Sequence, residues 1–247
     1  MKNINRTMLI IILLAIAVVI AAFSAFHFSH AEDEDEVATD TLMKHTAIQQ
    51  KEIDLIEKLG GNTPYPQIYV TAETLVQLKG YDKDKAVQEA ADRYVERKAL
   101  VWAAEKNGIL VSDQEFESYI QMLIDSIKTA DNYDELKAAY DANGLTLDEL
   151  YRGNEEFYRD NYIIDKLYDK WLQQRLDGET KVSQDEQENL DKTWETFIKE
   201  TVDEYKKSKT FKAAKLALDA SKKIYSAKQT TNVTELKNEK IWIDVNE

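Results

Sequence analysis

Apolar positions recur at helical spacing through most of the chain, and turn residues separate the periodic stretches. Three capping boxes mark helix starts, at residues 112–115, 146–149 and 183–186. Asn-Gly pairs at 107–108 and 143–144 are typical of helix ends. Because these signals agree with the hydrophobic period, the sequence predicts an all-α fold. The predicted helices cover residues 37–59, 72–79, 83–106, 112–129, 132–142, 146–176 and 183–228.

Two short segments differ from this helical pattern. Pro64 and Pro66 restrict the backbone just before residues 67–70, which read as a short strand. Near the end of the chain, residues 241–245 alternate weakly between apolar and polar side chains. The sequence therefore allows one short two-stranded pairing beside the helices.

The first thirty residues are a separate segment. Lys2 and Arg6 precede an almost wholly apolar run, which at about 1.5 Å per residue is long enough to cross a bilayer core of roughly 30 Å. Positive residues before the run place the N-terminus in the cytoplasm and the bulk of the chain outside. We therefore predict a signal anchor at residues 1–30 whose membrane-spanning helix is residues 8–28. A cleaved signal peptide ending near Ser24 is the alternative, and it exports the same bulk.

Composition excludes several classes of chemistry. The chain has no cysteine, and its three histidines all lie at or before His45, so most of it offers no cysteine nucleophile, Ser-His triad or histidine-ligated metal site. No glycine-rich phosphate loop and no calcium-binding loop motif occurs. Residues 31–247 hold 46 acidic and 30 basic residues, and this net charge of −16 repels nucleic-acid backbones. We predict a binding protein with no catalytic residues, metal or cofactor.

Two turn sequences carry a resemblance to a known family. A long helix ends in Gly-Ile-Leu-Val-Ser-Asp-Gln-Glu at residues 108–115, and Gly-Leu-Thr-Leu-Asp-Glu follows at residues 144–149. With the helices around these turns, residues 67–176 resemble the N-terminal domain of SurA- and PrsA-type extracytoplasmic chaperones, which is related to the chaperone domain of trigger factor. The resemblance implies a chaperone-like helical bundle that binds unfolded or newly exported polypeptides.

The chain also departs from these families. Their members usually continue into a parvulin-type prolyl isomerase domain, but the 71 residues after Leu176 contain no histidine and read as helix. The resemblance therefore implies holdase- or foldase-like binding without isomerase activity. We divide the chain into an anchor at 1–30, an acidic spacer and helix at 31–66, a chaperone-like domain at 67–176, and a C-terminal long helix and tail at 177–247.

A groove for unfolded chains needs large, adaptable apolar side chains, and tyrosine and methionine suit that need. Tyrosine at helical spacing is also typical of core and boundary positions, so a structural role is the alternative for each. The candidate client-binding residues are Tyr119, Met122, Tyr151, Tyr158, Tyr162 and Leu167.

A second function class stays open. The helix predicted at 146–176 becomes apolar nearly all round towards its end, so this end should be buried by more than one neighbour or by a partner. If residues 167–172 dock one fixed protein, the chain is a structural or scaffold subunit of a cell-envelope complex.

A lysine-rich segment runs from Lys206 to Lys228. It holds eight lysines and one aspartate, a net charge of +7, whereas residues 31–205 hold 20 basic and 41 acidic residues, a net charge of −21. One interpretation is a solvated helix that complements the acidic body through weak surface pairs. The other is contact with anionic lipid headgroups or an anionic wall polymer.

Overall fold

The computed structural model describes residues 34–59, 63–176 and 184–226, and every regular element in those ranges is an α-helix. The prediction of an all-α fold is therefore confirmed for this part of the chain. The helices are α2 (Glu34–Leu59), α3 (Tyr65–Lys79), α4 (Lys83–Lys106), α5 (Asp113–Lys128), α6 (Tyr133–Ala142), α7 (Leu147–Gly153), α8 (Glu155–Gln173), α9 (Gln184–Lys207) and α10 (Lys209–Ser226).

Local signals set the helix ends as expected. Ser112 and Thr146 each accept a hydrogen bond from the backbone N–H three residues on, and the carboxylate of the glutamate there accepts one from the backbone N–H of the cap, so the capping boxes at 112–115 and 146–149 form. The box predicted at 183–186 begins outside the described residues. Gly108 and Gly144 have φ angles of 71° and 69°, the left-handed conformation that ends a helix. The next residue in each case bonds back into the preceding helix, and Leu145 is 1% exposed.

The predicted strand at residues 67–70 is wrong, because these residues lie within α3. Pro64 and Pro66 lie at the start of this helix, where a backbone N–H has no acceptor inside the helix, so proline costs no hydrogen bond. The N–H of Ile68 donates to the carbonyl oxygen of Pro64 at 3.0 Å, and the Ile68 side chain is fully buried. The expected partner strand at 241–245 lies outside the described residues.

The helix predicted over residues 146–176 is divided into α7 and α8 at Asn154, whose φ and ψ are −112° and 46°. α2 comes close at this point, because a Cβ on Gly153 would lie 3.0 Å from Cδ1 of Ile53. The helix predicted over 183–228 is likewise divided at Ser208, whose Oγ accepts from the N–H of Phe211 at 3.0 Å. Periodicity marked the apolar faces correctly but did not show these breaks.

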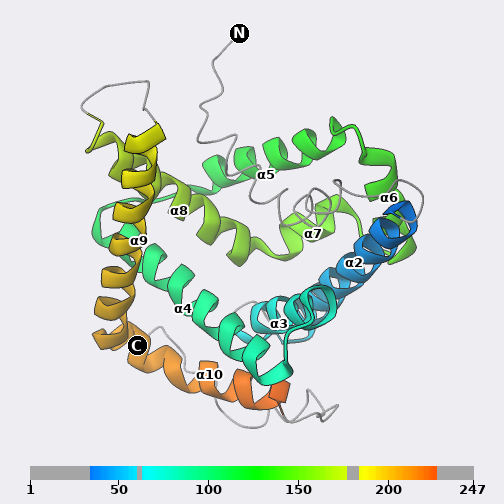
Figure 1. The fold of residues 1–247 in the computed structure, drawn as a ribbon, viewed down its shortest axis with the longest axis horizontal. Coiled ribbons are helices and arrows are strands. Elements are labelled where there is room, and N and C mark those ends of the chain that lie inside the picture. Colours follow the sequence, from blue (N-terminus) through cyan, green and yellow to red (C-terminus); the bar gives the residue numbers. More distant parts are fainter. Residues whose placement is uncertain (1–33, 60–62, 177–183, 227–247) are drawn as a thin grey trace.

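α4 lies at the centre of the fold, and α3, α8, α9 and α10 all pack against it. Figure 1 shows α5 along one side of the molecule and α10 along the opposite side, with α4 crossing between them. Small side chains allow this close packing around α4. Its buried residues are Ala86, Val87, Ala90, Ala91, Val95, Ala99, Leu100, Ala103 and Ala104.

The buried apolar residues form three clusters. The largest, called the tyrosine cluster below, joins α2, α5, α6, α7 and α8. A second joins α3 and α4 to Tyr205 of α9 and to Leu218 and Tyr225 of α10. The third joins α4 to the end of α8 and to α9. Residues 184–226 thus pack on the same central helix as α3 and α8.

The apolar end of α8 is covered by the chain itself. Leu167 and Trp171 are 3% and 4% exposed, and the Trp171 ring lies 5.0 Å from that of Trp194 in α9. Phe197 and Ile198 of α9 complete this cover. The end of α8 was expected to be buried either by neighbouring helices or by a partner protein. Within the described residues, neighbouring helices bury Leu167 and Trp171.

The membrane-spanning helix predicted at residues 8–28 lies outside the described residues. Within the described ranges, none of the helices combines the length and the apolar character that crossing a bilayer requires.

The left-handed glycine at the end of α6 gives a stability prediction. Gly144→Ala should lower the free energy of unfolding by about 1 kcal/mol, because an L side chain is strained at positive φ. Gly144→Asn is the matched control and should recover part of that loss, because asparagine tolerates this conformation better. Urea unfolding of the two variants measures the difference, and equal midpoints for wild type and Gly144→Ala would contradict the prediction.

Candidate functional site

Five of the six predicted client-binding residues meet in the tyrosine cluster. They are Tyr119 and Met122 of α5, Tyr151 of α7, and Tyr158 and Tyr162 of α8. Leu167 lies apart from them, in the cluster between α4, α8 and α9.

Most of these side chains face the interior. Tyr119, Tyr151 and Tyr158 are 8%, 6% and 9% exposed, and burial raises the pKa of each hydroxyl. The rings of Tyr151 and Tyr158 lie 4.6 Å apart, and those of Tyr119 and Tyr162 stack at 4.4 Å. With Leu167 also buried, Met122 and Tyr162 are the candidates that keep surface to offer.

A shallow depression of about 760 Å³, largely open to solvent, follows the outer face of α5. Its lining residues occupy the positions of this amphipathic helix that do not point into the tyrosine cluster. Met122 belongs to both, since it packs on the cluster and lines the hollow. This surface, called the α5 hollow below, is lined by Glu117, Ser118, Gln121, Met122, Asp125, Ser126 and Thr129.

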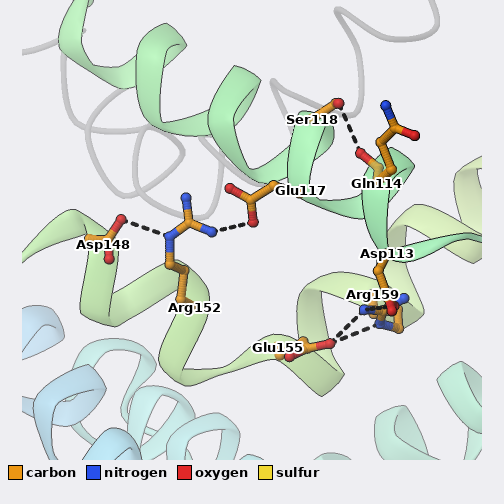
Figure 2. Close-up of polar contacts among 8 residues, drawn as sticks. All are labelled: Asp113, Gln114, Glu117, Ser118, Asp148, Arg152, Glu155 and Arg159. Atoms are coloured by element: carbon orange, nitrogen blue, oxygen red, sulfur yellow. Dashed lines mark hydrogen bonds and ion pairs between the residues drawn. The ribbon is translucent and has the colours of Figure 1, made fainter.

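Two arginines fasten α5 to the helices beneath it (Figure 2). Arg152 of α7 pairs with Asp148 of its own helix and with Glu117, which lines the hollow. This guanidinium lowers the pKa of Glu117, so the carboxylate stays charged at neutral pH. Arg159 of α8 joins Glu155 to Asp113 at the start of α5 in the same way. The bridges set the position of α5 along α7 and α8.

A second acidic group lies near the same helices. Asp165 of α8 is partly buried, and burial together with the neighbouring charge of Asp169 raises its pKa to about 7. Its charge also acts on the hydroxyl of Tyr119. The charge on this side of α8 therefore changes close to neutral pH.

A buried set of charges joins α4 to α8. Lys98 Nζ lies 2.6 Å from Glu156 and 2.7 Å from Asp160, and Arg97 Nε lies 3.2 Å from Asp160. The Arg97 and Asp160 side chains are only 13% and 8% exposed, so solvent screens this pair little. Each of the four groups faces an opposite charge, although Arg97 Nη2 is buried without a hydrogen-bond partner, and the charges fix the register of α8 on α4. They are called the α4–α8 charge cluster below.

Glu52 of α2 is buried beside this cluster. It is 4% exposed, and burial raises its pKa to about 8, although a hydrogen bond with Asn154 and the charge of Arg97 oppose the shift. At neutral pH most Glu52 carboxyls are therefore protonated. Asn154 is the residue at which α7 ends and α8 begins, so Glu52 lies against the break between them.

Sequence reasoning missed these buried polar groups, though one carried a signal. Glu52 lies four residues after Ile48 and four before Ile56, on one stripe of the helix predicted at 37–59, and that spacing places it on the apolar face. Arg97 and Asp160 are 63 residues apart, and no local pattern indicates that they meet. Among the residues that the structure describes, no group of three or more His, Asp or Glu is arranged to hold a metal ion.

The α4–α8 charge cluster predicts a large stability effect. Asp160→Asn should lower the free energy of unfolding by about 3 kcal/mol, because it leaves the buried Arg97 guanidinium without its carboxylate. Asp141→Asn is the matched control and should cost less than about 0.5 kcal/mol, because its pair with Lys137 is exposed. Urea unfolding measures both, and similar losses in the two variants would refute the structural role of Asp160.

The raised pKa of Glu52 predicts a pH dependence. Between pH 4.5 and 8 the folded chain holds a proton at Glu52 that the unfolded chain has lost, so this group lowers stability as the pH rises through that window. Glu52→Gln removes that loss, because glutamine does not ionise. Its free energy of unfolding should be close to that of wild type at pH 5 and roughly 3 kcal/mol higher than that of wild type at pH 8.5. Asp165 titrates in the same way in wild type and in Glu52→Gln, so its contribution cancels from the difference in stability between them.

Unfolding midpoints measured from pH 5 to 8.5 provide the test. Glu57→Gln is the control, because Glu57 lies on the same helix but is exposed, and its curve should follow that of wild type. A constant difference between wild type and Glu52→Gln across this range would show that Glu52 is ionised throughout.

Comparisons with known proteins found no match to this chain among family descriptions, curated proteins or solved structures. The resemblance of residues 67–176 to SurA- and PrsA-type domains therefore rests on the turn sequences and helix order alone, and the chain's binding properties have to be inferred from its own geometry.

Proposed function

We propose that this chain is a chaperone-like protein that binds unfolded or newly exported polypeptides outside the cell membrane, tethered by residues 8–28 and without prolyl isomerase activity. The α5 hollow is the observation that supports this proposal most, because it is an open surface where the Met122 side chain lies among polar groups on a helix that packs on the tyrosine cluster. The resemblance in residues 67–176 supports the same class of function.

The chemistry of the α5 hollow suits an extended peptide of varied sequence. Met122 supplies a pliable, polarisable contact that adapts to different apolar side chains. Ser118 Oγ already donates to the Gln114 carbonyl oxygen and Gln121 Nε2 to Asp125 Oδ1, so the groups left for an unpaired peptide backbone are mainly their acceptor oxygens and the Ser126 hydroxyl. Asp125 adds negative charge, which favours segments carrying lysine or arginine, whereas the charge of Glu117 is already paired with Arg152. Such a surface binds weakly and with little sequence preference.

The acidic body serves this role as well. The net charge of −16 on residues 31–247 keeps a protein soluble while it exposes apolar surface and carries an aggregation-prone client. The same charge disfavours acidic clients, so the proposed client class is neutral or basic unfolded segments.

The alternative, a scaffold subunit with one fixed partner, depended on a free apolar end at residues 167–172. The chain covers Leu167 and Trp171 with its own α9 and leaves Leu172 half-buried, so the apolar surface on which this alternative depends is smaller than the sequence pattern indicated.

Filling the α5 hollow should weaken client binding without unfolding the protein. Ser118 and Ser126 both line the hollow, and replacing both by glutamine occupies its volume at constant charge. The double variant S118Q/S126Q in the full chain, held in detergent, should lose about tenfold in client affinity, or ~1.4 kcal/mol. Light scattering of a denatured exported protein during refolding measures the suppression of its aggregation.

Thr196→Gln on the exposed surface of α9 is the matched control, and it should suppress aggregation as wild type does. Equal suppression by S118Q/S126Q and wild type would remove the α5 hollow from the proposal. If wild type itself suppresses no aggregation, and affinity capture instead yields one stoichiometric protein, the scaffold function replaces the chaperone function.

A further inference from the structure

The outer face of α10 combines an exposed leucine with lysines. Leu216 is 64% exposed, and the only other large apolar side chain comparably exposed in the described residues is Leu110. At about 100° per residue, Lys209, Lys212 and Lys223 all lie within roughly 40° of Leu216 around the helix. The opposite side of α10 packs on α3 and α4 through Leu218 and Tyr225. Leu216 is therefore the centre of a cationic face that points away from the core.

The lysines of this face have no carboxylate partner among the described residues. Lys209, Lys212 and Lys223 are exposed and form no ion pair with any acidic residue of the described ranges. By contrast, Arg152 and Arg159 on the α5 side each pair with two carboxylates. The α10 face therefore presents uncompensated positive charge on an otherwise acidic protein.

We propose that the α10 face (Lys209, Lys212, Leu216 and Lys223) docks on the anionic phospholipid surface of the membrane, with the lysines at the headgroups and Leu216 at the edge of the acyl region. Charge complementarity carries this assignment: near an anionic surface each lysine strengthens binding by about fivefold. Leu216 favours a phospholipid surface over an anionic wall polymer. An interfacial helix buries an apolar side chain in lipid, whereas a polyanion has no apolar region in which Leu216 could be buried.

The α10 face is a different surface from the α5 hollow, where we propose that clients bind. Figure 1 places α10 and α5 on opposite sides of the molecule, so we expect a chain docked through α10 to leave the α5 hollow free of the lipid. Docking would thus present the hollow to chains that emerge outside the membrane.

The absence of cysteine allows a direct experiment on the full chain. Ala220→Cys, about 40° from Leu216 on α10, is labelled with an environment-sensitive fluorophore, and the protein is reconstituted in nanodiscs of neutral or partly anionic phospholipid. We expect a blue shift in emission in anionic discs only, reversed by high salt because the lysine contribution is screened. Ala138→Cys, exposed on α6 among acidic residues, is the matched control and should show no shift.

Variants separate the two parts of the proposed contact. K209E/K212E/K223E should lower the docked population by roughly 100-fold or more, and Leu216→Gln should lower it while leaving the salt dependence in place. Retention of the protein by neutral discs reports the membrane anchor, and aggregation assays report the α5 hollow, so failure of either is distinguishable from failure of α10.

Three results would overturn the proposal. One is an unchanged emission in anionic discs. Another is a shift that soluble polyphosphate produces in neutral discs regardless of Leu216→Gln, which would assign the face to polyanions of the wall. The last is a shift in neutral discs that grows with protein concentration, which would assign the face to the acidic surface of a second copy.

Discussion

The fold depends on how closely other helices approach α4. Six of its nine buried residues are alanine, so helices can pack against it with little side chain between the backbones. α3, α8, α9 and α10 use this space, and two of the three apolar clusters include α4. An alanine surface fixes distance but not register, because one small residue resembles the next. Another interaction has to determine the register of each helix along α4.

For α8, the α4–α8 charge cluster supplies that register. Arg97 and Lys98 interrupt the alanine face of α4 where Glu156 and Asp160 of α8 cross it. A shift of one turn would leave buried charges unpaired, which costs far more than an exposed pair contributes. The same position fixes α2, because Glu52 approaches Asn154 and Arg97 there. Three helices are thus located by a few polar groups in one region.

The sequence predicted the features that local chemistry controls. Helix type, the two capping boxes and the glycine ends followed from neighbouring residues, and the structure bears them out. The strand expected at residues 67–70 failed for a local reason, since prolines that interrupt a helix also start one well. The prediction of one unbroken helix over residues 146–176 failed for a long-range reason. Ile53 approaches Gly153 closely beside the break at Asn154, and these residues are distant in sequence.

The candidate site shows the same limit. Periodicity placed Tyr119 on the apolar face of its helix and Met122 well outside it, but it did not show how many helices would cover each face. Five helices meet around the tyrosines and bury most of them, whereas α5 is covered on one side only and Met122 stays at the boundary.

This boundary position matters for the kind of binding proposed. A hollow lined by residues of a single helix could deform easily if that helix were loosely attached. α5 is instead anchored by a buried aromatic cluster beneath it and positioned by Arg152 and Arg159, whose exposed pairs add little stability but restrict sliding. Because the tyrosine cluster holds one side of α5, the adaptable part of the site is the Met122 side chain. A site that is already formed lowers the entropic cost of binding, which suits the weak and unselective contact that we propose.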